Sequence, residues 1–158
     1  MKRLIPLLAG LAALPLSTPA SAQVSPLLAP GSYVQEMTVD VEIVDSETGT
    51  LVDSWTDHDR FLDCRDTEAA LTLGPELDRD PRCAYEETGR GPGHVDFLVT
   101  CDFDEMLMSG TGTLDYHRAD LTGFAQTVSL FGYAGGQERR MTLRETARRT
   151  GACPAELR

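Results

Sequence analysis

Four cysteines limit how this chain of 158 residues can fold. They allow three pairings into two disulfides, and they stand at Cys64, Cys83, Cys101 and Cys153. A glycine-rich stretch, residues 89–93, lies midway between the middle two and is expected to turn the chain. A hairpin centred on Pro92 sets Cys83 opposite Cys101, where cross-strand Cβ atoms lie about 5 Å apart and can be bridged. We therefore favour a Cys83–Cys101 disulfide, which leaves Cys64 to pair with Cys153.

A zinc site with four cysteine ligands is the alternative use of these residues. Such sites place two of the ligands a few residues apart in the sequence. Here the stretches between successive cysteines contain 18, 17 and 51 residues, so no close pair exists. We favour disulfides, and disulfides persist in oxidising compartments such as the periplasm or the extracellular space.

The first 22 residues have the three parts of an export signal. Lys2 and Arg3 supply positive charge, residues 4–16 are largely apolar, and residues 20–22 read Ala-Ser-Ala, which is a small-residue cleavage pattern. The apolar part is shorter than the roughly 20 residues that cross a bilayer. We expect cleavage after Ala22, a periplasmic or secreted product, and no membrane span.

The remaining 136 residues are about the size of one domain. We expect a flexible N-terminal stretch at residues 23–30, a single β domain at residues 31–153 and a tail at residues 154–158. Without the two basic residues of the export signal, the formal net charge falls from −11 to −13. A surface with this charge repels nucleic acid, so no nucleic-acid partner is expected.

Alternating hydrophobicity predicts strands along most of the chain. Residues 33–43 alternate apolar and polar side chains, which is typical of a half-buried strand. Further strands are expected at residues 51–62, at the two arms of the hairpin around Pro92, and at residues 106–116, 121–131 and 140–149. One short helix is predicted from Thr67 to Leu73, with Asp66 as its N-cap and Gly74-Pro75 as its end.

These elements predict an all-β fold, an antiparallel meander of about seven strands with one short helix and two disulfides. Gly110 and Gly112 fall on the inward face of their strand together with Leu114. Glycines at such positions allow strong bending or the close approach of another element. We therefore expect the sheet to curl into a barrel or half-barrel.

The order of several short motifs resembles a known family of exported bacterial proteins, catalogued as domain of unknown function 3617. The matching features are Gly31-x-Tyr33, Cys64, Cys83, Val95-x-Phe97-x-Val99-x-Cys101, Gly110-x-Gly112-x-Leu114-x-Tyr116, Thr122-Gly123, Met141-Thr142 and Arg148-Arg149-x-Gly151-x-Cys153. Members often carry tryptophan where this chain has Tyr33. The resemblance implies an envelope or periplasmic β domain and brings no activity, so no catalytic residue can be carried over.

Three histidines could carry acid/base or metal chemistry. Asp57-His58-Asp59 groups three suitable side chains, but successive strand residues point to opposite faces, so His58 lies away from the two aspartates. His94 and His117 fall at predicted turns. We interpret all three as surface histidines.

Two further groups of side chains suit metal ions. Met106 and Met108 share a strand face, with Met37 and Met141 as possible neighbours, and thioethers select copper(I). Core packing is the alternative role of these methionines. The acidic turn at residues 102–105 could hold calcium, but it lacks the spacing of an EF-hand loop and equally suits a solvated turn.

No catalytic signature is present. The serines stand in no nucleophile motif, and the cysteines are assigned to disulfides. We predict no catalytic, cofactor-binding or metal-binding residue and no cofactor. The favoured hypothesis is a non-enzymatic exported envelope protein that binds a small apolar ligand or another envelope protein on the concave face of its sheet. Copper or calcium binding and an uncharacterised hydrolase are the alternatives.

Overall fold

The computed structural model of this chain describes residues 27–65, 69–70, 81–103, 106–116 and 121–155. The predicted export signal, residues 23–26 of the stretch predicted to be flexible, and the end of the C-terminal tail therefore lie outside the described residues. Among the described residues, no helix is long and apolar enough to cross a membrane.

Seven strands form one antiparallel sheet, which confirms the predicted all-β fold. Their order across the sheet is β3-β2-β9-β8-β7-β6-β5. The strands are β2 (Gly31–Asp45), β3 (Leu51–Arg65), β5 (Cys83–Gly91), β6 (His94–Phe103), β7 (Met106–Tyr116), β8 (Gly123–Ala134) and β9 (Gln137–Gly151). Two short strands, β1 (Leu27–Leu28) and β4 (Ala69–Ala70), pair with each other in a second small sheet.

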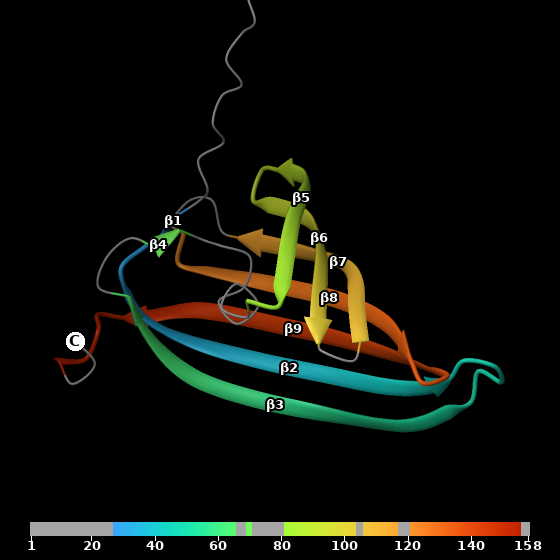
Figure 1. Cartoon of the computed structure of the whole chain (residues 1–158). Coiled ribbons are helices and arrows are strands. Elements are labelled where there is room, and N and C mark those ends of the chain that lie inside the picture. The colour runs from blue at the N-terminus through green and yellow to red at the C-terminus, as the bar shows by residue number, and fades with distance from the viewer. Residues whose placement is uncertain (1–26, 66–68, 71–80, 104–105, 117–120, 156–158) are drawn as a thin grey trace, which may run out of the picture.

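The meander runs without interruption from β5 to β9, and the hairpin β2–β3 then adds beside β9. Strands β2 and β9 pair from Ser32↔Gly151 to Asp45↔Gln137, so the first and last long strands of the chain are neighbours. The sheet does not close on itself. Strand β3 forms one edge and β5 the other, as Figure 1 shows.

Two inward glycines explain how the sheet bends into a half-barrel. A side chain on Gly110 would collide with the carbonyl oxygen of Ser129 on β8, and one on Gly112 would collide with the ring of Phe97. Strand β8 therefore approaches β7 more closely than a larger residue would permit, and the Phe97 ring lies over the backbone of β7. Both contacts agree with the predicted role of these glycines in curling the sheet.

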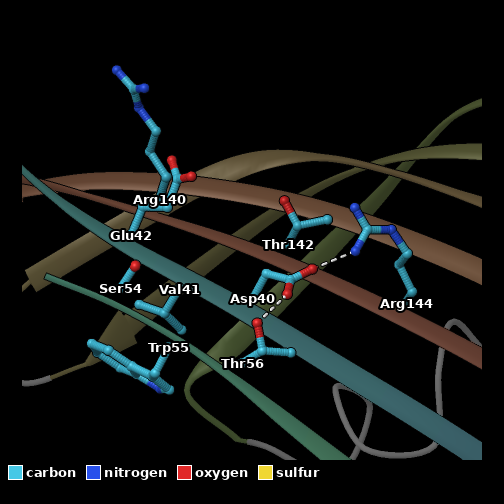
Figure 2. A pocket seen from close by; sticks show the side chains of 9 residues that line it. All are labelled: Asp40, Val41, Glu42, Ser54, Trp55, Thr56, Arg140, Thr142 and Arg144. Atoms are coloured by element: carbon cyan, nitrogen blue, oxygen red, sulfur yellow. Dashed lines mark hydrogen bonds and ion pairs between the residues drawn. The ribbon is translucent and has the colours of Figure 1, made fainter. Parts of the chain in front are cut away.

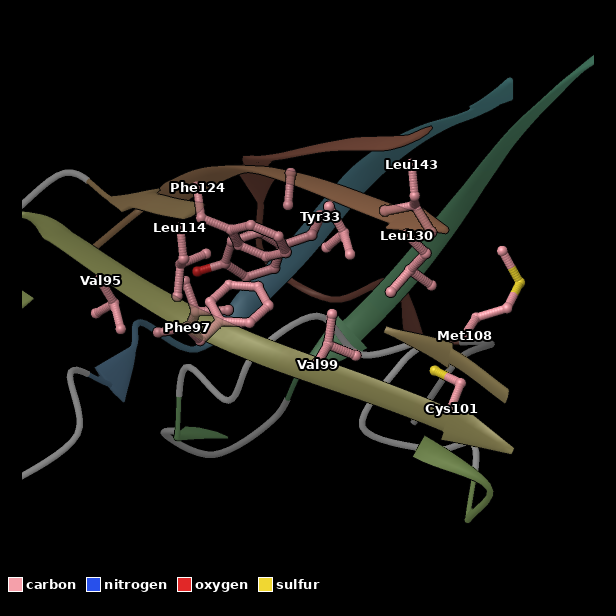
Figure 3. Close-up of a cluster of buried hydrophobic side chains, with 13 residues drawn as sticks. Tyr33, Val95, Phe97, Val99, Cys101, Met108, Leu114, Phe124, Leu130 and Leu143 are labelled. Carbon is pink, nitrogen blue, oxygen red and sulfur yellow. The ribbon is translucent and has the colours of Figure 1, made fainter. Parts of the chain in front are cut away.

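The hydrophobic core lies on the concave face (Figure 3). Tyr33 is fully buried at its centre, and its hydroxyl donates a hydrogen bond to the carbonyl oxygen of Ala29 at 2.6 Å. The other members are Leu28, Val95, Phe97, Val99, Cys101, Met108, Leu114, Phe124, Val128, Leu130, Leu143 and Ala147. The alternation of apolar and polar residues along the strands therefore places apolar side chains at most inward positions of the central strands.

The two disulfides are Cys83–Cys101 and Cys64–Cys153, the pairs favoured by the hairpin around Pro92. Cys83 lies directly opposite Cys101 on neighbouring strands. Cys64, near the end of β3, is joined to Cys153, two residues beyond the end of β9. The first disulfide therefore staples a hairpin, and the second holds the end of an edge strand.

The predicted helix from Thr67 to Leu73 is wrong at Ala69 and Ala70, which form strand β4. They pair with Leu28 and Leu27, and Leu28 is buried in the core. Pairing with this non-local strand overrides the weak local helix signal. The other positions of the predicted helix lie outside the described residues, and the described residues contain no α-helix.

Candidate functional site

A recess of about 520 Å³ opens at one end of the concave face. One wall comes from the β6–β7 hairpin and the other from the turn between β8 and β9. The lining residues are Phe103, Met106, Met108, Ala134, Gly135, Gln137 and Arg139. Figure 3 shows Met108 at this end of the buried cluster, away from Tyr33.

The register of three strands brings the walls of the recess together. Met108 on β7 pairs with Gly132 on β8, and Gly132 pairs with Arg139 on β9. A Cβ atom on Gly132 would lie 2.9 Å from Cγ of Met108 and 3.0 Å from Cγ of Met106. The two thioether side chains therefore lie over the backbone of β8 and make an apolar surface that faces Arg139.

Positive charge borders this apolar surface. Arg139 is exposed and makes no ion pair with any described residue, although the chain as a whole is strongly acidic. The guanidinium carbon of Arg82 lies 4.8 Å from the centre of the Phe103 ring, which is a cation–π contact. The neighbouring Arg140 points to the opposite face of the sheet and is paired with Glu138. The recess thus combines an apolar wall with a guanidinium that forms no ion pair with a described residue.

Three buried polar side chains lie farther along the same face. Gln126 on β8 faces Glu145 on β9, and Gln35 lies on the next strand, β2. Gln35 donates a hydrogen bond to Asp63 at 3.3 Å, whereas neither amide atom of Gln126 has a hydrogen-bond partner among the described residues. A buried amide without partners costs about 1–3 kcal/mol. Sequence reasoning missed these residues, although each occupies an inward position of an alternating strand.

The centre of the concave face is filled by the protein's own side chains. Tyr33, Phe97 and Val128 are almost completely buried there, next to Gln35 and Gln126. A ligand on this face therefore has space away from these central residues, as in the end recess and in a hollow of about 490 Å³ beside Tyr116 and Phe124.

A second groove, of about 640 Å³, crosses the outer face of β2, β3 and β9 (Figure 2). Asp40 lies at its centre, accepts a hydrogen bond from the Thr56 hydroxyl at 2.7 Å and pairs with Arg144. These two bonds, with that of Thr56 the stronger cause, lower the pKa of the Asp40 carboxyl. The Asp40 carboxylate at the centre of this groove is therefore already bound by Thr56 and Arg144.

The two described histidines, His58 and His94, lie on the outer face of the sheet, in line with their interpretation as surface residues. His58 contacts the Thr38 hydroxyl at 3.1 Å, whereas Asp57 and Asp59 face the other side, opposite Val39 and Met37. The predicted separation of His58 from its two neighbouring aspartates is therefore confirmed.

His94 lies between two carboxylates, with Nδ1 2.6 Å from Asp115 and Nε2 3.0 Å from Asp96. The hydrogen bond to Asp115, followed by that to Asp96, raises the pKa of the imidazole. No serine hydroxyl within the described parts of the chain is hydrogen-bonded to a histidine. His117 lies outside the described residues.

The calcium and copper hypotheses differ in how many of their proposed ligands the structure describes and brings together. No group of three or more His, Cys, Asp or Glu side chains that could hold a metal occurs in the parts of the chain that the structure describes. Two residues of the acidic turn, 104 and 105, lie outside those parts. Met106 and Met108 do line one recess, but Met37 lies elsewhere, in register with Glu145.

Comparison with known proteins shows a family match. A family model described as "Protein of unknown function (DUF3617)" matches residues 28–153, which span all seven strands of the main sheet and both disulfides. No curated protein and no solved structure matches the chain.

Proposed function

Since this chain belongs to the DUF3617 family of proteins of unknown function, only its own residues can indicate a role, and we propose that it is an exported envelope protein that binds a small amphiphilic anion in the end recess. The apolar part of such a ligand lies against Phe103, Met106 and Met108, and its acidic group is held by Arg139. The protein is a binding protein and not an enzyme in this proposal.

The observation that carries the proposal is the exposed Arg139 beside an apolar wall. A guanidinium binds carboxylate or phosphate oxygens through two parallel hydrogen bonds, which gives both affinity and orientation. Methionine side chains are flexible and adapt to apolar ligands of different shape. A recess with these two parts suits a molecule that has an apolar body and one anionic end.

The proposed location rests on two features. The first 22 residues have the composition of an export signal, and the chain forms two disulfides. In this proposal, the seven strands of the main sheet and the flanking Cys153 belong to one domain, which carries the recess.

Copper(I) binding is the second candidate, because two thioethers line the same recess. The positive charge of Arg139 disfavours it, since a cation in the recess would be repelled by the guanidinium. The same charge attracts an anion. The sign of the charge on the bound molecule therefore distinguishes the two candidates.

Titration of the mature protein with three probes of equal chain length tests the proposal. The probes are decanoate, decanol and decyltrimethylammonium, and binding is measured by calorimetry and by NMR shifts of the methionine methyl groups. We expect decanoate to bind best and to shift Met106 and Met108. Arg139→Gln should weaken decanoate binding about tenfold, the size of one charge-assisted hydrogen bond.

Arg140→Gln is the matched control, because it removes the same charge from the next residue of the strand, on the opposite face. It should leave decanoate binding unchanged. Equal binding of decanol and decanoate, or equal loss in both variants, would contradict the proposal. Tight binding of copper(I) by the wild type that Arg139→Gln strengthens would favour the second candidate instead.

A further inference from the structure

Strand β3 is an edge strand with both faces open to solvent. Every residue from Leu51 to Arg60 is exposed, including Trp55, whose exposed fraction is 40%. The strand has 15 residues and pairs only with β2, and no described strand lies beyond it in Figure 1. A long edge of this kind presents unpaired backbone groups that can accept a further strand.

Aspartate side chains bond to part of the backbone of this strand. The amide of Ser54 donates a hydrogen bond to Asp53 at 2.8 Å, and the amide of Arg60 donates one to Asp59 at the same distance. Local bonds of this kind compete with strand pairing. A strand that adds to β3 must therefore supply these two carboxylates with a new partner in place of the backbone amides.

The concave side of β3 carries a row of negative charge. Its inward positions face Ile43, Val41, Val39, Met37, Gln35 and Tyr33 of β2. These six positions are Asp53, Trp55, Asp57, Asp59, Phe61 and Asp63. Four of the six are therefore carboxylates, and the other two are aromatic. Asp63 forms an ion pair with Arg65 at 3.0 Å, whereas the other three aspartates form none with a described residue.

This row disfavours a second copy of the chain as the added strand. In a two-fold antiparallel pair of β3 strands, residues of the same face lie opposite each other. In every register that pairs more than half of the strand, at least one of the four aspartates then lies directly opposite an aspartate of the other copy. Like charges directly opposite on neighbouring strands are destabilising.

We propose that the β3 edge binds an extended basic segment of another protein, which adds to the sheet as an eighth strand. Lysine or arginine at alternate positions of that segment faces the row of aspartates, and its apolar stems contact Trp55 and Phe61. Backbone carbonyls of the segment accept hydrogen bonds from the amides of Ser54 and Arg60. The carboxylates that these amides release then form ion pairs with the lysine or arginine side chains of the segment. The site is separate from the end recess and does not depend on what the recess binds.

A short peptide in which lysine alternates with threonine tests this proposal. Its affinity for the mature protein is measured by calorimetry, and hydrogen exchange reports which amides it protects. We expect binding, with new protection along β3 and none along the opposite edge strand β5. Two control peptides are used, one with the same residues and the lysines in a single block, and one with N-methylated backbone amides at the pairing positions.

The protein variants separate the aspartate row from overall charge. Asp57→Asn with Asp59→Asn removes two carboxylates from the row and should weaken the alternating peptide about tenfold. Glu42→Gln with Glu47→Gln removes two carboxylates elsewhere and should change the affinity little. Equal affinity for the blocked or N-methylated peptide would overturn the proposal in favour of non-specific charge attraction. Concentration-dependent dimers of the wild-type chain with protected β3 amides would overturn it in favour of a second copy.

Discussion

The two edges of the sheet differ in length, regularity and chemistry. Edge strand β5 has nine residues, a bulge between Glu87 and Gly89, and a disulfide that joins Cys83 to the neighbouring strand. Edge strand β3 has 15 residues, and its pairing with β2 shifts register only near its beginning, at Ile43 and Val44. One edge is short, irregular and cross-linked, whereas the other is long and regular.

This difference shows two ways of protecting a sheet edge. Bulges and short strands remove the template for further pairing whatever the partner is. Charge on a regular edge repels some strands and attracts others. The β5 edge is therefore a poor template for any additional strand, whereas the β3 edge disfavours only those strands whose charge does not match its aspartates.

The disulfide at the end of β3 should contribute most to stability. Cys64 and Cys153 are 89 residues apart in the sequence, and closing so long a loop lowers the entropy of the unfolded chain most. We expect replacement of both residues by serine to lower the free energy of unfolding by more than about 4 kcal/mol, measured by urea denaturation. Hydrogen exchange should rise first at the end of β3.

The disulfide of the β5 edge should contribute less. Cys83 and Cys101 are 18 residues apart, and the same entropy argument gives about 3 kcal/mol. In the double serine variant we expect β5 to exchange its amide hydrogens faster, because the staple to β6 is lost, while β3 keeps its protection. A loss larger than that of the other pair would show that the β5 edge, and not the β3 edge, depends on its cross-link.

Local patterns allowed the hairpins to be predicted from the sequence. The glycine-rich stretch around Pro92 and the alternation on both sides place Cys83 opposite Cys101, as observed. The bulge after Glu87 was not predicted, and it shifts the register so that Gly91 pairs with His94. A single extra residue in one strand leaves no clear mark on the alternation of apolar residues.

Long-range pairings could not be predicted. The pairing of β2 with β9 brings together the first and last long strands of the chain, and no local sequence signal specifies this pairing. The recess does not depend on this pairing, because Arg139 meets Met108 through the registers of the consecutive strands β7, β8 and β9. The buried Gln126 was missed for another reason, since a polar residue at an inward position looks like an ordinary break in the pattern.

Opposite responses to pH should distinguish the two sides of the sheet. On the β3 side, the hydrogen bond from Thr56 and the charge of Arg144 hold the pKa of Asp40 below its ordinary value of 3.8. A carboxyl with a lowered pKa stabilises the fold above its unfolded value, and this stabilisation is lost as the pH falls through the folded value. Acid should therefore weaken the attachment of β3 to β2, because Asp40 accepts the hydrogen bond from Thr56 on β3.

On the β5 side, His94 responds in the other direction. Hydrogen bonds to Asp115 and Asp96 raise its pKa above the ordinary value of 6.5. The charged imidazole stabilises the fold fully below pH 6.5, and this stabilisation is lost as the pH rises through the raised folded value. Base should therefore weaken the contact between the start of β6 and the end of β7.

Both effects should be small, because the two groups are exposed, and NMR titration with amide exchange can resolve them by position. His94→Gln should abolish the change above pH 6.5 near β6 and leave the acid response of β3 intact. Asp40→Asn should do the reverse. If either variant removed both responses, the two sides of the sheet would be coupled through β9 and β8, and the edges could not be treated as independent.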